Sequence, residues 1–252
     1  MCRIIAVSNQ KGGVGKTSTC INLAAGVALK GKKVLLCDID PQGNATTGLG
    51  VEKGALKNSV YNVLIGEVSA ADAIVKTSVD NLKILPSNAD LAGAEVELVS
   101  ARGRDKKLKD ALAPIKDRFD YIFIDCPPAI GILTINALTA CDGVLVPIQS
   151  EFYALEGLAQ LMNTFRLVKK SLNPAIEIEG VLITMFDGRA LVSRQTREEI
   201  VKFFGKKVYK TVIPRNVRVS EAPSYGQPIM IYDKKCKGAI AYGALVDEFL
   251  GR

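Results

Sequence analysis

Histidine is absent from the 252 residues of this chain, and so is tryptophan. Without histidine, no imidazole is available to act as a general base or to bind a metal ion. Any activation of water must therefore depend on a carboxylate or on positioning alone.

Cysteine is scarce and shows no paired pattern. None of the six cysteines belongs to a C-x-x-C pair, and four lie in or beside apolar runs, where cysteine usually serves as a small core residue. The chain also lacks an apolar run as long as a membrane span, and no signal peptide is visible at its start. We therefore expect a cytoplasmic protein with reduced thiols.

The overall composition is typical of one folded domain. Hydrophobic residues make up 48% of the chain and charged residues 23%. No linker, repeat or low-complexity stretch divides the chain, so we expect a single domain over residues 1–252. Lysine and arginine number 33 against 26 acidic residues. The net charge of +7 favours polyanionic partners, although a solvated basic surface would have the same composition.

Short apolar runs rich in β-branched residues alternate with helical patterns along the chain. The strand candidates are residues 4–8, 33–38, 82–85, 121–125, 143–147 and 178–184, and the helix candidates are residues 16–29, 89–99, 105–116, 133–140, 154–172, 192–204 and 239–250. Several strands are apolar without alternation, as strands buried on both faces are. This order predicts an α/β fold with a mostly parallel sheet flanked by helices on both faces, where ligands bind at the carboxyl ends of strands.

A glycine-rich loop follows the first predicted strand and leads directly into a helix. Its residues 9–17 read N-Q-K-G-G-V-G-K-T, in the context of a P-loop. Glycine lets backbone N–H groups curl around phosphate oxygens, and the helix N-terminus adds a positive dipole end. Lys16 would then contact the β- and γ-phosphates of ATP, and the Thr17 hydroxyl would bind Mg²⁺. An ordinary glycine turn is the alternative, but it has no need of Lys-Thr at the helix start.

The loop departs from the standard pattern at one point. G-x-x-x-x-G-K-[ST] places its first glycine at position 10, where this chain has Gln10, and a second lysine, Lys11, follows. An added positive charge would help to neutralise the transferring phosphoryl group, where charge stabilisation is the main catalytic contribution. We therefore predict that both Lys11 and Lys16 take part in catalysis.

Carboxylates stand at the ends of two further predicted strands. Asp38 and Asp40 end the second strand, where they would share one face of an extended segment. Asp125 follows four apolar residues, which is the Walker B arrangement that delivers a carboxylate to the metal. Each aspartate could instead cap a turn, but beside a P-loop they favour Mg²⁺ binding and water orientation. We predict Asp40 as the catalytic carboxylate, and Thr17, Asp40 and Asp125 as metal ligands.

Taken together, these motifs resemble those of a known family. Residues 11–17 resemble the deviant Walker A box, and residues 38–44 and 124–128 resemble its partner boxes. The match continues through residues 133–138, 153–157, 213–218 and 220–226. The sequence is similar to ParA/Soj-type chromosome- and plasmid-partitioning ATPases of the MinD/ParA superfamily, most of all to the short chromosomal Soj type. The resemblance covers essentially the whole chain and implies the P-loop NTPase fold.

The resemblance also implies roles for individual residues. Lys11 resembles the signature lysine that reaches the nucleotide of the partner subunit in an ATP-sandwich homodimer. Gly12 resembles the glycine that permits close approach of the two loops, and residues 184–187 and 214–216 resemble those that line the adenine pocket. The nucleotide-binding residues expected on this basis and from the P-loop are Lys11, Gly12, Gly13, Val14, Gly15, Lys16, Thr17, Ser18, Met185, Pro214, Arg215 and Asn216.

Partners follow from the same resemblance. The ATP-bound dimer of the family binds double-stranded DNA without sequence preference, and Arg189 and Arg218 occupy positions of DNA-contacting arginines. Surface salt bridges are the alternative for both, whereas contacts to phosphates would give salt-dependent binding. A ParB/Spo0J-type partner stimulates hydrolysis in this family, which implies a nucleoid-associated protein. The sequence leaves open whether the cargo is a chromosome, a plasmid or another body.

Two related classes are the alternatives. MinD-like membrane-associated positioning ATPases end in a basic amphipathic helix, whereas residues 238–252 here are almost free of Lys and Arg and acidic in their last turns. We therefore expect no membrane binding. The other alternative is a metallo-cluster or metabolic ATPase on the same scaffold, but the cysteines lack the pairing that the cluster of the nitrogenase iron protein needs.

Overall fold

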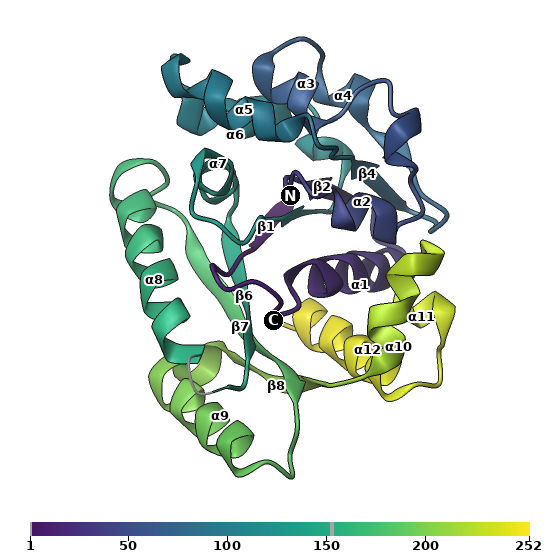
Figure 1. Ribbon diagram of the computed structural model, residues 1–252, viewed down its shortest axis with the longest axis vertical. Helices are drawn as coiled ribbons and strands as arrows, with labels where there is room; N and C mark the ends of the chain where they lie inside the picture. Colours follow the sequence, from purple (N-terminus) through teal and green to yellow (C-terminus); the bar gives the residue numbers. More distant parts are fainter. Residues whose placement is uncertain (1, 152–153) are drawn as a thin grey trace.

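One eight-stranded sheet organises the chain in the computed structural model, which describes residues 2–151 and 154–252 (Figure 1). The strands are β1 (Arg3–Val7), β2 (Val34–Asp38), β3 (Val75–Lys76), β4 (Leu82–Leu85), β5 (Tyr121–Asp125), β6 (Gly143–Gln149), β7 (Glu177–Phe186) and β8 (Val208–Pro214). They lie in the order β3-β4-β2-β5-β1-β6-β7-β8, and every neighbouring pair is parallel except β3 and β4. The predicted mostly parallel sheet is therefore confirmed.

Helices cover both faces of this sheet. They are α1 (Lys16–Leu29), α2 (Asn44–Gly48), α3 (Val60–Ile65), α4 (Ala70–Ala73), α5 (Leu91–Glu97), α6 (Lys107–Leu112), α7 (Ile132–Ala140), α8 (Ala154–Ser171), α9 (Leu191–Phe204), α10 (Val217–Glu221), α11 (Ile229–Tyr232) and α12 (Lys237–Leu250). Short 3₁₀ segments lie at Lys53–Ala55, Leu98–Ser100, Arg104–Lys106, Lys116–Arg118, Gly205–Lys207 and Ala222–Tyr225. Figure 1 shows α1 and α12 on one side of the sheet and α7 and α8 on the other.

Alternation along the strands explains how one sheet supports two hydrophobic cores. Ile4 and Ala6 pack in the core beneath α7 and α8, whereas Ile5 and Val7 pack in the core beneath α1 and α12. Successive side chains of a strand point to opposite faces, so a strand covered on both sides must be apolar throughout. The continuous apolar runs in the sequence have this cause.

Some elements differ from the sequence patterns for identifiable reasons. The helix expected over residues 105–116 is α-helical only over Lys107–Leu112. Pro114 lacks an N–H and disfavours helical geometry in the residue before it. At the other end, the Leu108 N–H donates to the Asn136 side chain of α7 at 3.0 Å rather than within its own helix. The pattern of residues 89–99 likewise forms α5 followed by a 3₁₀ turn.

The edge strands β3 and β8 are not apparent in the sequence patterns. β3 has only two residues, and β8 pairs with β7 through shifts of register. The formation of both strands depends on pairing with a neighbouring strand more than on the hydrophobic periodicity of their own residues. The family-like stretch at residues 153–157 begins at Tyr153, which lies outside the described residues. Within the described part of the chain, no helix has the length and apolar character that crossing a bilayer requires.

Candidate nucleotide site

Three central strands bring the candidate residues to one edge of the sheet. β2, β5 and β1 are neighbours, and Asp125 is in register with Asp38 on one side and with Val7 on the other. The carboxyl ends of parallel strands lie at the same edge. The loop after Val7 therefore meets the carboxylates that follow β2 and end β5.

The loop between β1 and α1 takes its shape from glycine. Gly13 and Gly15 have φ angles of 74° and 85°, in the left-handed region that glycine adopts without strain. A Cβ on Gly12 would meet nothing within 4 Å among the described residues, so none of them requires glycine at that position. The Asn9 side chain accepts a hydrogen bond from the Lys11 N–H at 3.1 Å and so holds the start of the loop.

A cavity of about 330 Å³ lies over this loop. It is lined by Gly12, Gly13, Gly15, Lys16, Thr17, Ser18, Asp40, Gln42, Asn44, Pro128 and Met185. Lys16 is buried, and its ammonium donates to the Lys11 carbonyl at 3.0 Å. Burial lowers the pKa of Lys16, while the nearby Asp125 and Asp40 charges act against that shift. A buried ammonium in such a cavity is stabilised by an anionic ligand.

Asp38 and Asp40 have different environments, although the sequence pattern places them on one face. The Asp38 carboxylate accepts hydrogen bonds from the Thr46 N–H at 2.8 Å, the Thr46 hydroxyl at 2.7 Å and the Asp40 N–H at 3.2 Å. Its burial raises the pKa of Asp38 to about 6, and the bonds from Thr46 oppose the rise. Only Asp40 lines the cavity, because β2 ends at Asp38 and the chain then turns, with the Gly43 N–H donating to the Asp40 carbonyl.

Asp125 is fully buried, and both of its carboxylate oxygens lack a hydrogen-bond partner among the described residues. Burial, together with the neighbouring Asp38 charge, raises the pKa of Asp125 well above its usual value, and the nearby Thr17 side chain and Lys16 charge oppose the rise. The described residues contain no group of three or more His, Cys, Asp or Glu side chains that could hold a metal ion. Mg²⁺ does not need such a cage, since it commonly binds one or two carboxylates, waters and substrate phosphates. The unpartnered Asp125 carboxylate fits a site of that kind.

Replacing Asp125 with asparagine is expected to raise the melting temperature of the nucleotide-free protein at pH 8 by roughly 2–10 °C, because a buried, unpartnered charge costs about 1–3 kcal/mol. The folded-state pKa lies above the unfolded value, so the carboxylate destabilises the fold at high pH. That cost shrinks as the pH falls from the folded pKa toward the unfolded one. Thermal melts of both proteins should therefore show a gain at pH 8 that declines toward pH 5. A gain in melting temperature that does not change with pH would contradict the assignment of Asp125 as a buried carboxylate with a raised pKa.

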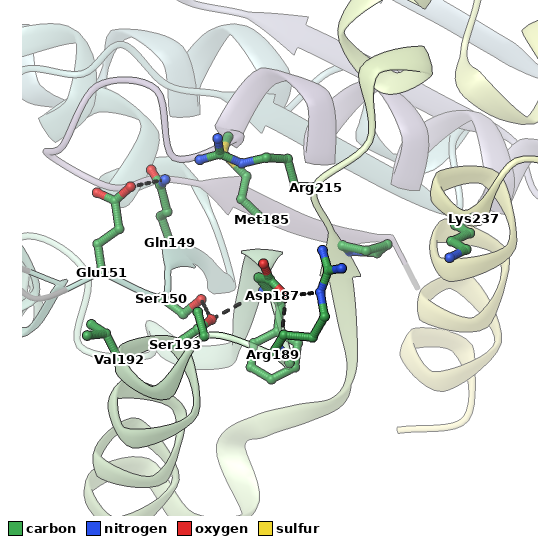
Figure 2. A pocket seen from close by; sticks show the side chains of 14 residues that line it. Gln149, Ser150, Glu151, Met185, Asp187, Arg189, Val192, Ser193, Arg215 and Lys237 are labelled. Atoms are coloured by element: carbon green, nitrogen blue, oxygen red, sulfur yellow. Dashed lines mark hydrogen bonds and ion pairs between the residues drawn. The ribbon is translucent and has the colours of Figure 1, made fainter.

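A second cavity of about 880 Å³ adjoins the first at Met185, which lines both. Met185 has a φ of 50°, which is unusual for a residue other than glycine and marks a constrained strand end. Pro214 and Arg215 also line this cavity (Figure 2). Asn216 follows them, and its side-chain oxygen is buried without a hydrogen-bond partner in the described residues. Of the predicted adenine-pocket residues, Met185, Pro214 and Arg215 thus line one cavity, whereas Asn216 is in the lining of neither cavity.

Lys11 is not among the residues that line the cavity over the phosphate loop. Its ammonium lies 3.0 Å from one carboxylate oxygen of Glu151. The other oxygen of Glu151 accepts a hydrogen bond from Gln149 (Figure 2). The Lys11 side chain is 35% exposed. Within one chain, therefore, Lys16 and Asp40 line the same cavity but the Lys11 ammonium does not join them.

The two predicted DNA-contacting arginines occupy separate surface positions. The Arg189 side chain is 95% exposed and lies 3.4 Å from Asp187 at the rim of the second cavity (Figure 2). Arg218 is on α10 and binds Glu221 at 3.0 Å. Exposed ion pairs of this kind contribute little to stability, so both guanidinium groups are available to a ligand.

The structure adds residues that the patterns alone do not single out. Gln42 and Asn44 line the cavity over the phosphate loop, and Glu151 binds Lys11. Gln42 and Asn44 belong to the recognised box at residues 38–44, but the motif does not say which of its side chains face a ligand. Glu151 comes two residues after β6, so the rule that ligands bind at strand ends could have identified it.

The fold and this edge of the sheet define the class of protein. A parallel sheet whose first strand leads through a glycine-rich loop into α1 is the P-loop NTPase fold. A family model described as an AAA domain matches residues 2–178. The sporulation initiation inhibitor protein Soj of Bacillus subtilis (strain 168) is 56% identical over 248 residues, covering 98% of each chain. The chromosome partitioning protein ParA of Caulobacter vibrioides (strain NA1000 / CB15N) is 51% identical over 252 residues, covering 99% of this chain and 94% of its own. This chain belongs to the ParA/Soj family of partitioning ATPases.

A solved structure of similar fold has another activity in its name. Cobyrinic acid a,c-diamide synthase from Mycobacterium smegmatis with bound ADP and magnesium matches with a TM-score of 0.88 and 39% identity, covering 100% of this chain and 97% of that one. Its identity is lower than that of either partitioning relative. The metabolic alternative is therefore less well supported than partitioning.

Proposed function

We propose that this protein is a DNA-segregation switch in which Mg-ATP closes a homodimer, the dimer binds DNA, and hydrolysis to ADP and phosphate releases it. One domain over residues 1–252 carries all of these steps. The observation that carries the proposal is the cavity over the phosphate loop, which buried Lys16 and Asp40 both line. The sequence similarity to Soj and ParA supports a role in partitioning.

Mg-ATP suits the groups around the phosphate loop. Lys16 would bind the β- and γ-phosphates, and backbone N–H groups from Gly13 to Ser18 would cradle them. The unpartnered Asp125 carboxylate, with Thr17 and Asp40, would hold Mg²⁺. The ion, when bound, neutralises charge on the phosphate oxygens. Solved neighbours described with ADP and magnesium and with an ATP analog and magnesium support this assignment.

The adenine base would lie in the adjoining cavity. Met185, Pro214 and Arg215 supply apolar and planar surfaces there. The buried, unpartnered oxygen of Asn216 is an acceptor suited to an exocyclic amino group. Because Met185 lines both cavities, one nucleotide could extend from the phosphate loop into the cavity that Pro214 and Arg215 line.

A second copy of the chain would complete the site. Among the described residues, Gly12 has no neighbour within 4 Å of the position that a Cβ would take, so the space beside it is open to a second subunit. Close approach of a second phosphate loop would use that space. Lys11, partly exposed beside it, would then leave Glu151 for a phosphate of the partner's ATP.

Hydrolysis would depend on Asp40, since no histidine is available. Its carboxylate lines the cavity that would hold the γ-phosphate and could orient the attacking water. Positioning and charge neutralisation carry most of the catalysis in phosphoryl transfer. A ParB/Spo0J-type protein would accelerate this step, so turnover of the protein alone should be slow.

DNA binding would use basic groups on the dimer surface. Arg189 is almost fully exposed, Arg218 lies on the surface helix α10, and the chain carries a net charge of +7. Contacts of this type bind phosphates without reading sequence and would place the protein on the nucleoid. The MinD-like alternative has less support, because α12 buries Tyr242, Leu245 and Phe249 in the core.

Binding to a random-sequence DNA duplex tests the proposal. Fluorescence anisotropy should show binding with ATP but little with ADP or without nucleotide, and affinity should fall steeply as salt is raised. Replacing Arg189 with alanine should reduce affinity at least about tenfold, because the dimer loses two phosphate contacts. Arg118→Ala is the matched control, since Arg118 is also exposed but precedes β5 at the opposite edge of the sheet.

Three outcomes would contradict parts of this assignment. Absence of DNA binding in every nucleotide state would contradict the DNA-binding step. The ATPase assignment would stand, and the protein would then be tethered by another protein or by a membrane. ATP-dependent binding to vesicles of anionic lipid instead of DNA would favour the MinD-like alternative. Equal losses in the Arg189 and Arg118 variants would show that charge, rather than position, determines the affinity.

A further inference from the structure

The loop that carries Asp40 is held from behind by a relay of hydrogen bonds, which we call the Asp38–Thr46–Ser87 relay. The Thr46 hydroxyl donates to Asp38 at 2.7 Å and accepts from the Ser87 N–H at 2.9 Å. The Ser87 hydroxyl donates to the backbone carbonyl of Asp40 at 2.7 Å. The relay therefore connects the end of β2 to the main chain of Asp40 through a residue that follows β4.

Every member of the relay is removed from solvent. Asp38, Thr46 and Ser87 are 0% exposed. Hydrogen bonds in such a low-dielectric setting are stronger than in water, and a group left without its partner is costly. The arrangement therefore favours one position of the loop.

Close packing reinforces the relay. A Cβ on Gly43 would lie 2.9 Å from the Ser87 carbonyl oxygen, so the loop after Asp40 lies directly against the segment that follows β4. β4 is itself fixed beside β2, with Leu85 in register with Cys37. The sheet thus sets the position of Ser87, and Ser87 sets the position of the Asp40 carbonyl.

The relay residues do not line the cavity over the phosphate loop, whereas Asp40 does. Within the described part of the chain, the hydrogen bonds to the Asp38 carboxylate come from Thr46 of α2 and from the Asp40 N–H. This is the opposite of Asp125, whose oxygens lack partners in the described chain. The Asp38 carboxylate is thus placed to hold the loop, and the Asp125 carboxylate is placed to bind a cation.

We infer that Thr46 and Ser87 are positioning residues for hydrolysis, which act by holding Asp40 at the reacting phosphate. This inference rests on the proposed ATPase function and on Asp40 as its water-orienting group. A displacement of about 1 Å at a reacting group can cost about a hundredfold in rate. Loss of the relay should therefore lower turnover while ATP binding, which depends on the phosphate loop, is preserved.

Thr46→Val and Thr46→Ser form the matched pair for the test. Valine keeps the shape of threonine without its hydroxyl, and serine keeps the hydroxyl. With Mg-ATP, valine should lower kcat roughly 10- to 100-fold while KM and the Kd for a non-hydrolysable ATP analogue change less than about threefold. Serine should restore most of kcat. Thr139→Val is the control, because Thr139 is equally buried and its hydroxyl donates to the Ile135 carbonyl of its own helix α7, and its kcat should match wild type.

A second arm separates positioning from general damage to the fold. In an Asp40→Ala background, Thr46→Val should cause little further loss, since residues that act through one group are not additive. Ser87→Ala, which removes only the bond to the Asp40 carbonyl, should lower kcat less than Thr46→Val and provides a second variant if valine prevents folding.

The outcomes are distinct. Unchanged kcat in both Thr46→Val and Ser87→Ala would overturn the inference and leave the ATPase assignment intact. A proportional loss of kcat and ATP affinity, or a further full loss in the Asp40→Ala background, would also overturn it, because the hydroxyls would then act on the fold as a whole. Wild-type protein that binds ATP but never hydrolyses it would instead refute the proposed function.

Discussion

Replacing Lys16 with alanine is expected to weaken ATP binding at least about 30-fold, from the loss of roughly 2–5 kcal/mol in a buried charge-assisted contact. Lys16 is buried in the cavity over the phosphate loop, and its pKa is lowered by burial, so its charge is costly without an anion. The free protein should therefore lose little stability and could gain some. Calorimetric titration with ATP and Mg²⁺ measures the first effect, and a thermal melt measures the second.

Lys30→Ala is the matched control for that measurement. Lys30 directly follows the last residue of the same helix, and its ammonium lies 2.6 Å from a carboxylate oxygen of Asp247 on α12. This pair is at the surface, where ion pairs contribute little, so Lys30→Ala should bind ATP as the wild-type protein does. Wild-type affinity in Lys16→Ala would contradict the nucleotide assignment.

Replacing Asp40 with alanine is expected to lower ATP turnover by about 10²–10⁴-fold, the usual contribution of a positioned acid–base group. Asp40 lines the cavity from the loop after β2 rather than from the phosphate loop, so the loss should fall on kcat, with ATP affinity changed only a few-fold. Phosphate release under saturating Mg-ATP measures the effect. The variant should still dimerise and bind DNA with ATP, because the phosphate loop, Thr17 and Asp125 would still hold Mg-ATP.

Asp40→Asn separates the charge of this residue from its place in the loop. Asparagine keeps an oxygen that can accept the hydrogen bond from the Gln42 N–H, which Asp40 receives at 2.9 Å. A loss of turnover as large as in Asp40→Ala would assign the effect to the carboxylate charge. Undiminished turnover in Asp40→Ala would remove Asp40 from the catalytic step and direct attention to Gln42 or Asn44, which line the same cavity. Undiminished turnover in Asp40→Asn alone would exclude only a role for the charge.

The predictable part of the site is the part whose signals are local. The glycine-rich loop stands between a strand and a helix, and α1 spans Lys16–Leu29 as its pattern predicts. Asp125 ends a strand of apolar residues, and β5 spans Tyr121–Asp125 as expected. Such signals survive folding because strand, turn and helix geometry are set mainly by neighbouring residues and by alternation of side chains.

A P-loop α/β fold, the order of its central elements and the carboxylates at its strand ends could thus be predicted from local sequence signals. The sequence also predicts Asp40 rather than Asp38 as the catalytic carboxylate, but the different contacts of the two aspartates are visible only in the folded chain, where Asp38 accepts a hydrogen bond from Thr46 and Asp40 lines the cavity. Tertiary structure also decided that Lys11 pairs with Glu151, which lies 140 residues away. These outcomes depend on hydrogen bonds between distant segments, and such bonds form only where the assembled sheet brings the segments together.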